Sequence, residues 1–409
     1  MNLQFWGLIA YVALFFFKPY EMYPFLIPLR LALVVPIITL VLVFVFGKFK
    51  IPKTSESILL ILFFFFSLIS SIISPFYNES NISIADLFKP ITLFFLIVMV
   101  LDDERSIKRF IWIILIFTVF DNVGSFLAFK QGLFGNRYRF ASYYGGIGGD
   151  ANEYGLHMIM LLSLPILLIV YESSLAKKIF LIFSFFSYAY CFTRTLSRGS
   201  MVACAAVLLQ IFIIQRKNLK YMVFMIALIA FLLYKTPESF WGRMDTITAK
   251  KDYADHAVRE RFMAWEDGMK MIKRNPFLGV GLGAFPYARE KIAGRLEERD
   301  AKFIAHNTYI EIAAETGFIN LFVFILIAFI VVKGSRNSEK FFEKSKHFYL
   351  KSLTQGLRIG FIAFLVSGVF MSQQYYRFFY IFVGVLTSIK ILKEEMVDRD
   401  DKKFVESKH

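Results

Sequence analysis

The segment from Ala305 to Gly317 carries the residues best suited to proton transfer in this chain. It reads Ala-His-Asn-Thr-Tyr-Ile-Glu-Ile-Ala-Ala-Glu-Thr-Gly and joins a charged stretch to an apolar run. If the segment is helical, Asn307, Glu311 and Glu315 recur on one face, with His306 at its edge. This would be a titratable face at the water interface of a membrane helix. The alternative is that His306 and Asn307 only cap the helix, because Asn is a favoured N-cap residue.

The composition is typical of a polytopic membrane protein. The chain is 57% hydrophobic and 18% aromatic, with 50 Phe residues, which exceeds the usual apolar share of soluble domains. A net charge of +15 would suit a nucleic-acid partner, but the basic residues are spread over short connectors between apolar runs. Membrane orientation explains that distribution better. We therefore predict no nucleic-acid partner. The two cysteines and the histidines lack metal-site spacing, so we predict no metal ion and no disulfide.

The pattern predicts an all-α polytopic membrane protein with about twelve transmembrane helices and one large, partly helical outer loop. The apolar runs are centred on residues 3–17, 25–46, 58–74, 87–101, 110–129, 154–171, 179–192, 201–214, 221–234, 310–332, 356–371 and 378–392. Residues 1–234 would hold the first nine helices, 235–305 the outer loop with amphipathic helices, 306–393 the last three helices and 394–409 a charged cytoplasmic tail.

The distribution of basic residues predicts the orientation. Lys and Arg are denser in alternate short connectors, such as 48–53, 105–109, 216–220 and 333–351, than in the connectors between them. The positive-inside rule therefore places both termini in the cytoplasm and residues 235–305 on the outer side.

Two polar stretches of the predicted outer side lie at helix starts. Residues 145–153 begin with glycines and end with Asp150, Ala151, Asn152 and Glu153. The glycines could form an anion-binding nest, but a loop followed by an Asp or Asn cap explains them as well. Ser197-Arg198-Gly199-Ser200 follows Arg194 closely. Snorkelling accounts for one arginine, whereas two beside a helix N-terminus fit an anion site better.

The outer loop has internal order of its own. Residues 259–273 place Met263, Trp265, Met269 and Ile272 near helical spacing among charges, which predicts an amphipathic helix. For Arg259 and Arg261, both in this helix, a solvated charged face is the alternative to a functional role. A glycine-rich turn follows at 279–283, and close approach of its backbone to the membrane domain or to a ligand would explain the glycines.

Taken in order, these motifs resemble those of the O-antigen ligase and O-antigen polymerase family, integral membrane glycosyltransferases with a ligase-related domain. The matching features are Ser-Arg-Gly at 197–199, Arg261 with Trp265 before Asn275-Pro276, the 279–283 turn, and His306-Asn307 followed by Glu-Thr-Gly at 315–317. Asp150-Ala151-Asn152 is similar to an Asp-Pro-Asn pattern of the family, with Ala in place of Pro.

The resemblance implies a metal-independent, inverting transfer of a glycan from a polyprenyl (undecaprenyl) diphosphate to an acceptor hydroxyl. The expected place is the periplasmic face of a bacterial inner membrane, in lipopolysaccharide or polysaccharide assembly at the cell envelope. No cofactor is expected, because the diphosphate already activates the sugar. The partners would be the lipid-linked glycan, a carbohydrate acceptor such as lipid A-core, and the bilayer. A polymerase of the same family, a lipid-linked oligosaccharide flippase or transporter, and an assembly protein are the alternatives.

Roles for individual residues follow from the same resemblance. We expect Arg198 and Arg261 to bind the donor diphosphate, with Arg194 or Arg259 able to replace either. His306 would be the catalytic general base, since an imidazole with a pKa of about 6.5 has a neutral form near neutral pH. The residues expected to orient or bind substrate are Asn307, Glu311, Glu315, Asp150 and Asn152.

Overall fold

The chain is a bundle of helices in the computed structural model, which describes residues 3–46, 52–133, 139–144, 149–235, 256–293 and 304–406. Within these ranges there are helices and connectors but no strand. The first helices are α1 (Leu3–Phe17), α2 (Pro19–Met22), the 3-10 helix η1 (Pro24–Leu29), α3 (Leu31–Phe46), α4 (Ser55–Ile72), α5 (Tyr77–Val100) and α6 (Glu104–Lys130). The next are α7 (Ala151–Leu168), α8 (Leu175–Thr195), α9 (Arg198–Gln215), α10 (Leu219–Lys235), α12 (His256–Arg274) and α13 (Phe285–Ala293). The last three are α14 (Thr308–Lys344), α15 (Phe348–Ser367) and α16 (Arg377–Glu406).

The protein is a polytopic helical membrane protein. In the part of the chain that the structure describes, α4 to α9 and α14 make 7 helices that are long and apolar enough to cross a bilayer, while α1 and α3 are apolar but shorter. Every apolar run of the sequence lies on a helix, although the crossing of the membrane by about twelve of them stays a prediction. The run 25–46 is not one helix, because Pro28 lies in η1 and Arg30 has a left-handed φ of 44° before α3 begins.

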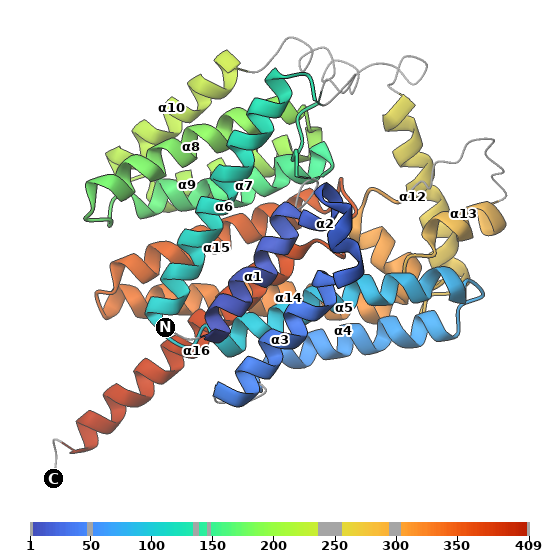
Figure 1. Cartoon of the computed structure of the whole chain (residues 1–409), viewed down its shortest axis with the longest axis horizontal. Coiled ribbons are helices and arrows are strands. Elements are labelled where there is room, and N and C mark those ends of the chain that lie inside the picture. Colours follow the sequence, from blue (N-terminus) through green and yellow to red (C-terminus); the bar gives the residue numbers. More distant parts are fainter. Residues whose placement is uncertain are drawn as a thin grey trace.

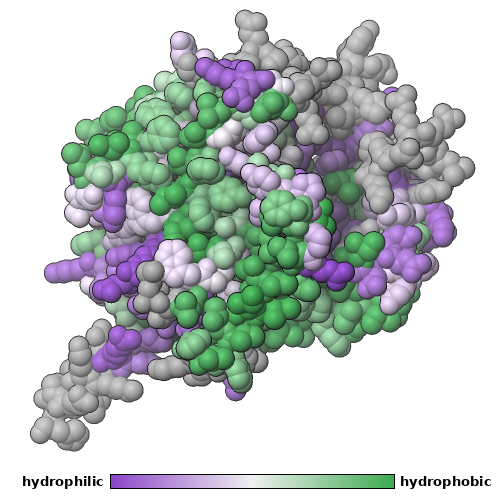
Figure 2. All heavy atoms as spheres, in the orientation of Figure 1, coloured by the Kyte–Doolittle hydropathy of each residue, from purple (hydrophilic) through white to green (hydrophobic). Residues whose placement is uncertain are grey.

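The two ends of the bundle differ (Figure 1). The short helices α12 and α13 lie at one end, and both termini lie toward the other. We call the first of these the site end; it also carries the connectors 139–144, 304–307 and 368–376. Apolar surface faces outward along the side of the bundle in Figure 2, where α3 exposes Leu33, Ile37, Val41 and Phe44. Such a surface suits contact with lipid chains.

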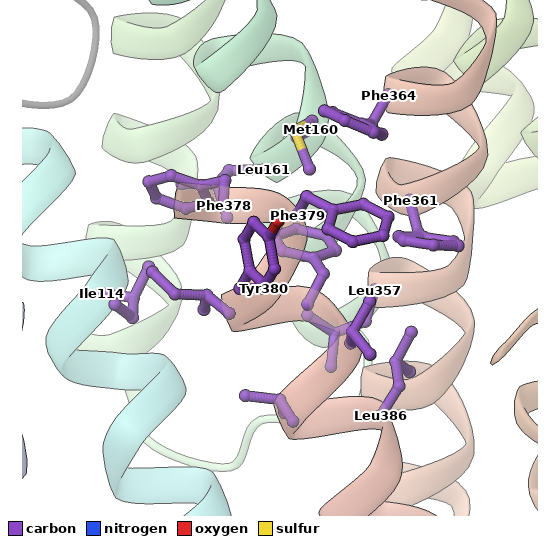
Figure 3. Close-up of a cluster of buried hydrophobic side chains, with 14 of the residues drawn as sticks. Ile114, Met160, Leu161, Leu357, Phe361, Phe364, Phe378, Phe379, Tyr380 and Leu386 are labelled. Atoms are coloured by element: carbon purple, nitrogen blue, oxygen red, sulfur yellow. The ribbon is translucent and has the colours of Figure 1, made fainter. Parts of the chain in front are cut away.

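Helix α7 forms the centre of the core and packs against α8, α9 and α15. Its residues from Tyr154 to Leu168 are buried all round, which fits a helix that is apolar on every face. Figure 3 shows Met160 and Leu161 of α7 beside Phe361 and Phe364 of α15 and a group of aromatic side chains from α16. This packing fixes the start of α7 relative to the 368–376 connector, and both contribute to the site.

Candidate active site

Residues 304–307 lead into α14, and their backbone is held firmly. Asn307 is the N-cap, and its Oδ1 accepts hydrogen bonds from the backbone N–H groups of Tyr309 and Ile310, each at 3.0 Å. The capping interpretation is therefore correct for Asn307. His306 lies just outside the helix with a left-handed φ of 48°, so its side chain leaves the chain in a different direction from the cap.

The connector 368–376 supports the start of α14 from one side. The Thr308 N–H donates to the Gly368 carbonyl at 2.7 Å, and the Thr308 hydroxyl donates to the Met371 carbonyl at 2.6 Å. The same hydroxyl oxygen accepts the backbone N–H of Gln373 at 3.0 Å. Buried hydrogen bonds of this kind are costly to leave unmade, so the connector is firmly joined to Thr308, two residues after His306.

Helix α12 reaches His306 from another side. The Trp265 indole N–H donates to the Ala305 carbonyl at 3.0 Å, which ties α12 to the residue before His306. Arg261 lies one turn earlier on α12 and interacts electrostatically with the His306 ring. Arg259, two residues away on the same helix, is exposed. The structure thus brings Arg261 to His306 and leaves Arg259 on the solvent side.

The environment of His306 favours its neutral form. Burial lowers the pKa of His306 from its ordinary value, and the positive charge of Arg261 lowers it further. The negative charge of Asp150 raises this pKa and offsets part of the shift. Asp150 comes from the start of α7, where it is the N-cap and accepts the Asn152 N–H at 2.7 Å. Residues from three elements far apart in the sequence therefore act electrostatically on one imidazole, whose neutral form can accept a proton.

Glu311 and Glu315 share the face of α14 that the sequence predicts, but that face is not at the water interface. Glu311 is 4% exposed and Glu315 1% exposed. The Glu315 carboxylate accepts the N–H groups of Gly283 at 2.8 Å and Phe285 at 3.2 Å, and the side-chain amide of Gln374 at 2.6 Å. The Glu315 oxygens therefore join α14 to the glycine-rich turn, to the start of α13 and to the 368–376 connector. Glu311 lies against the Ser372 hydroxyl, close to the 368–376 connector.

The glycine-rich turn 279–283 approaches the membrane domain closely. Helix α14 is broken at Gly317, whose φ is 83°, and the carbonyls of Ala314 and Glu315 accept the N–H groups of Val280 at 2.9 Å and Gly281 at 2.8 Å. A Cβ on Gly279, which has a φ of 67°, would lie 2.3 Å from the Glu315 carbonyl. Of the two explanations for these glycines, the structure supports close approach to the membrane domain.

The start of α7 is joined to the start of α9 through Asn152. The Asn152 side-chain oxygen accepts Arg139 Nη2 at 2.7 Å, and its carbonyl accepts the Ser200 hydroxyl at 3.2 Å. Arg139 Nε also donates to the Thr195 carbonyl at 2.9 Å. Asn152 therefore has a positioning role in this connector, and the glycines at 145–148 lie outside the described residues.

Arg194 and Arg198, on either side of Ser197, belong to different helices. Ser197 caps α9 by accepting the Ser200 N–H at 3.3 Å, and half-buried Arg198 is the first residue of that helix. Arg194 ends α8, with its guanidinium 5.4 Å from the centre of the Tyr190 ring. Gly199 packs against the side chains of the 368–376 connector, because a Cβ there would lie 2.9 Å from Met371 Cε. Gly199, next to Arg198, and Thr308, two residues after His306, therefore contact the same connector.

Sequence reasoning missed several residues that build this site. Arg139 belongs to none of the motifs described above. A second case is the buried ion pair of Arg289 Nε with Asp267 Oδ2, at 2.8 Å, which joins α12 to α13 across 22 positions of sequence. Polar residues within a charged segment could have suggested such a pair, but nothing in their spacing indicates which residues meet.

The comparison with known families adds an independent observation. Residues 158–336 match the family model described as O-antigen ligase. Over this segment the chain is similar to the O-antigen ligase family. It contains Arg194, Arg198, Arg261 and His306, whereas Asp150 and Asn152 precede it. No curated protein matches the chain. The resemblance to the family of membrane glycosyltransferases that includes O-antigen ligases and polymerases is thus confirmed.

Proposed function

We propose that the protein transfers a glycan from a polyprenyl diphosphate to the hydroxyl of an acceptor, as an O-antigen ligase does. The observation that carries the proposal is the position of His306 beside α12, fixed by the Trp265–Ala305 hydrogen bond, where Arg261 and Asp150 act on its ring, together with the match to the O-antigen ligase family. A neutral imidazole beside a cationic guanidinium suits a reaction in which one substrate loses a proton and the other releases a diphosphate.

The reaction assigns a task to each side of the site. The acceptor hydroxyl gives its proton to a ring nitrogen of His306, and its oxygen attacks the anomeric carbon of the donor sugar. The bond from that carbon to the diphosphate oxygen breaks on the opposite face, which inverts the configuration. The diphosphate leaves with the electron pair, and Arg261 and Arg198 stabilise its negative charge through the two N–H donors that each guanidinium can present.

No metal ion or cofactor is needed in this proposal. The diphosphate is already a good leaving group, and the arginines supply the positive charge that a metal would otherwise provide. Arg194 is the reserve candidate for the diphosphate, because it lies one short turn from Arg198. Arg259 is less suited, because it is exposed on the other side of α12.

We further propose that the site end faces the periplasm of a bacterial inner membrane and that both termini are cytoplasmic. The arrangement in Figure 1 supports this, since the termini lie away from α12 and α13. Both native cysteines are buried, which leaves a low background for labelling. A cysteine at exposed Lys273 should react with an impermeant reagent in intact inner-membrane spheroplasts, and one at exposed Lys344 should not. The reverse pattern would contradict the orientation.

The test of the reaction is a comparison of histidine variants at the two ends of α14. His306→Asn keeps a residue that tolerates a positive φ but has no basic nitrogen, and His347→Asn makes the same change at the far end. We expect His306→Asn to retain folding and donor binding and to lose about 10²-fold or more in single-turnover transfer. His347→Asn should match the parent.

Several outcomes would argue against the proposal. Transfer by His306→Asn within a few-fold of the parent would remove His306 from the role of base. A parent protein that moves unmodified lipid-linked glycan across liposomes without forming a new glycosidic bond would be a flippase. With the lipid-linked glycan as its own acceptor, chain growth would identify a polymerase, whereas transfer only to lipid A-core would identify a ligase.

A further inference from the structure

A polar cavity of about 250 Å³ lies at the site end, beside the connector 368–376. It is bounded by the starts of α7 and α16 and by α5. The side chains that give it its character are Glu153, Ser372, Gln373, Tyr375, Tyr376 and Arg377. None of these is among the residues to which the proposed reaction assigns a role. The cavity offers room for one small polar group such as a single sugar ring.

Gln373 has hydrogen-bonding capacity that the protein does not use. Its side chain is 4% exposed, and its Oε1 accepts no hydrogen bond from the described part of the chain. Its Nε2 has a weak contact with Met371 Sδ at 3.8 Å. Because the backbone N–H of Gln373 is bonded to Thr308, the side chain is held at the wall of the cavity. A buried amide oxygen without a donor is costly, and a ligand hydroxyl that donates to it would recover that cost.

The charged groups of the cavity favour a neutral ligand. Glu153 adds an acceptor, and Arg377 adds a fork of donors. Arg377 forms no salt bridge with a described carboxylate, and its guanidinium lies 4.8 Å from the centre of the Phe15 ring. Asp86 is paired with Lys89 at 2.8 Å and Glu153 lies beside Arg377, so the wall has no excess of positive charge that would select a diphosphate. Carboxylate, amide, guanidinium and tyrosine rings together suit a sugar, whose hydroxyls bond polar groups and whose C–H face covers an aromatic ring.

The position of the cavity relates it to the proposed base. The backbone N–H of Gln373, in the cavity wall, donates to the hydroxyl of Thr308 at 3.0 Å, two residues after His306. Asp150 also interacts electrostatically with both His306 and Glu153. Ser372 of the cavity wall also lies near Glu311, one turn into α14. The phosphate-directed arginines belong to α9 and α12, which do not line the cavity.

We infer that this cavity is the acceptor subsite, and that it holds the sugar ring whose hydroxyl is glycosylated or the ring next to it. Inversion requires the acceptor oxygen to approach the anomeric carbon from the face opposite the diphosphate. A subsite for a neutral ligand, close to His306 and apart from Arg198 and Arg261, meets that requirement. The inference rests on the proposed function, because it assumes that an acceptor hydroxyl must reach His306.

The experiment uses the full-length protein in nanodiscs and two isosteric variants of the cavity. Gln373→Leu removes the unpaired amide, and Glu153→Gln removes the acceptor charge. The control is Gln210→Leu, because Gln210 of α9 also has a buried Oε1 without a described partner but lies outside the cavity. The binding probes are the methyl glycosides of glucose, galactose, N-acetylglucosamine and heptose, followed by saturation-transfer NMR. Transfer is measured with lipid-linked glycan as donor, and with rough lipopolysaccharide or a second lipid-linked glycan as acceptor.

We expect at least one methyl glycoside to bind the parent and the Gln210→Leu control. Each cavity variant should weaken that binding and raise the acceptor KM about tenfold, the effect of one lost hydrogen bond, with the donor KM within twofold of the parent. Equal glycoside signals in parent and cavity variants, or a rise confined to the donor KM, would overturn the acceptor subsite. A parent that binds glycosides but forms no glycosidic bond would overturn the proposed function instead. Folding of each variant is checked by its elution and thermal midpoint before comparison.

Discussion

The close approach of the 279–283 turn to α14 can be tested with one pair of glycine substitutions. Gly279 and Gly132 both have left-handed backbones, with φ of 67° and 71°. Alanine at either position costs about 1–2 kcal/mol for that conformation. No described atom lies within 4 Å of a Cβ on Gly132, whereas a Cβ on Gly279 would lie 2.3 Å from the Glu315 carbonyl carbon and oxygen. The pair therefore separates the cost of the backbone from the cost of the contact.

The additional cost at Gly279 follows from the hydrogen bonds on either side of the contact. Relieving a 2.3 Å contact with backbone atoms requires the turn to move away from α14. That movement breaks the bonds of Val280 N–H to Ala314 and of Gly281 N–H to Glu315. Each is worth about 1 kcal/mol net, and a buried group left unpaired costs about 1–3 kcal/mol. We expect Gly279→Ala to lose about 2–4 kcal/mol more stability than Gly132→Ala.

Both variants would be purified in the same detergent and unfolded by heat and by denaturant, with single-turnover transfer measured on the folded fraction. Gly132→Ala should remain close to the parent in transfer rate. Gly279→Ala should unfold earlier and transfer more slowly, because the turn braces the helix that begins beside His306. Equal unfolding midpoints for the two variants would show that the turn is not pinned to α14, and the structural explanation of the glycine motif would then be wrong.

Two further predictions concern the charges around His306. Arg261→Lys should raise the donor KM about tenfold or more, because a lysine cannot bind a phosphate through two parallel N–H donors. The neighbouring Arg259→Lys should match the parent. Similar effects of both changes would contradict the assignment. Asp150→Asn keeps an N-cap residue but removes a charge that raises the pKa of His306, so the acid limb of the pH–rate profile should move to lower pH. An unchanged or higher limb would show that Asp150 does not act on the base.

Local signals in the sequence predicted much of the helical framework. Apolar runs and the spacing of apolar residues depend on contacts within one helix, so the membrane helices and amphipathic α12 could be predicted without knowing what they touch. The N-cap at Asn307 is local for the same reason. The order of arginine and histidine motifs added the family, which the comparison confirms for residues 158–336.

Partners that lie far apart in the sequence could not be predicted in this way. The sequence indicates that Glu315 is polar and shares a helix face with Asn307. Its hydrogen-bond donors, however, are Gly283 and Gln374, and Gln374 is 59 positions away. Which carboxylate of α14 is used structurally depends on how the turn and the 368–376 connector dock, and no periodicity encodes that. The cavity lined by Gln373 and Arg377 could not be predicted for the same reason, because it forms only where these residues pack beside the start of α7.

The position of Arg261 predicts that the strength of the base depends on the donor. In the free enzyme, burial and the Arg261 charge lower the pKa of His306, which keeps the ring neutral but makes it a weaker base. A diphosphate bound to Arg261 would offset that charge and raise the pKa of His306 again. Proton removal from the acceptor would then be strongest when a donor is present. The acid limb of the pH profile of kcat/KM for the donor reports the pKa of His306 in the free enzyme. The acid limb of the pH profile of kcat reports the pKa of His306 in the complex with substrate. We expect the limb of kcat to lie at the higher pH. A limb of kcat at the same or a lower pH would show that the diphosphate does not neutralise the charge that acts on His306, and would place the donor elsewhere.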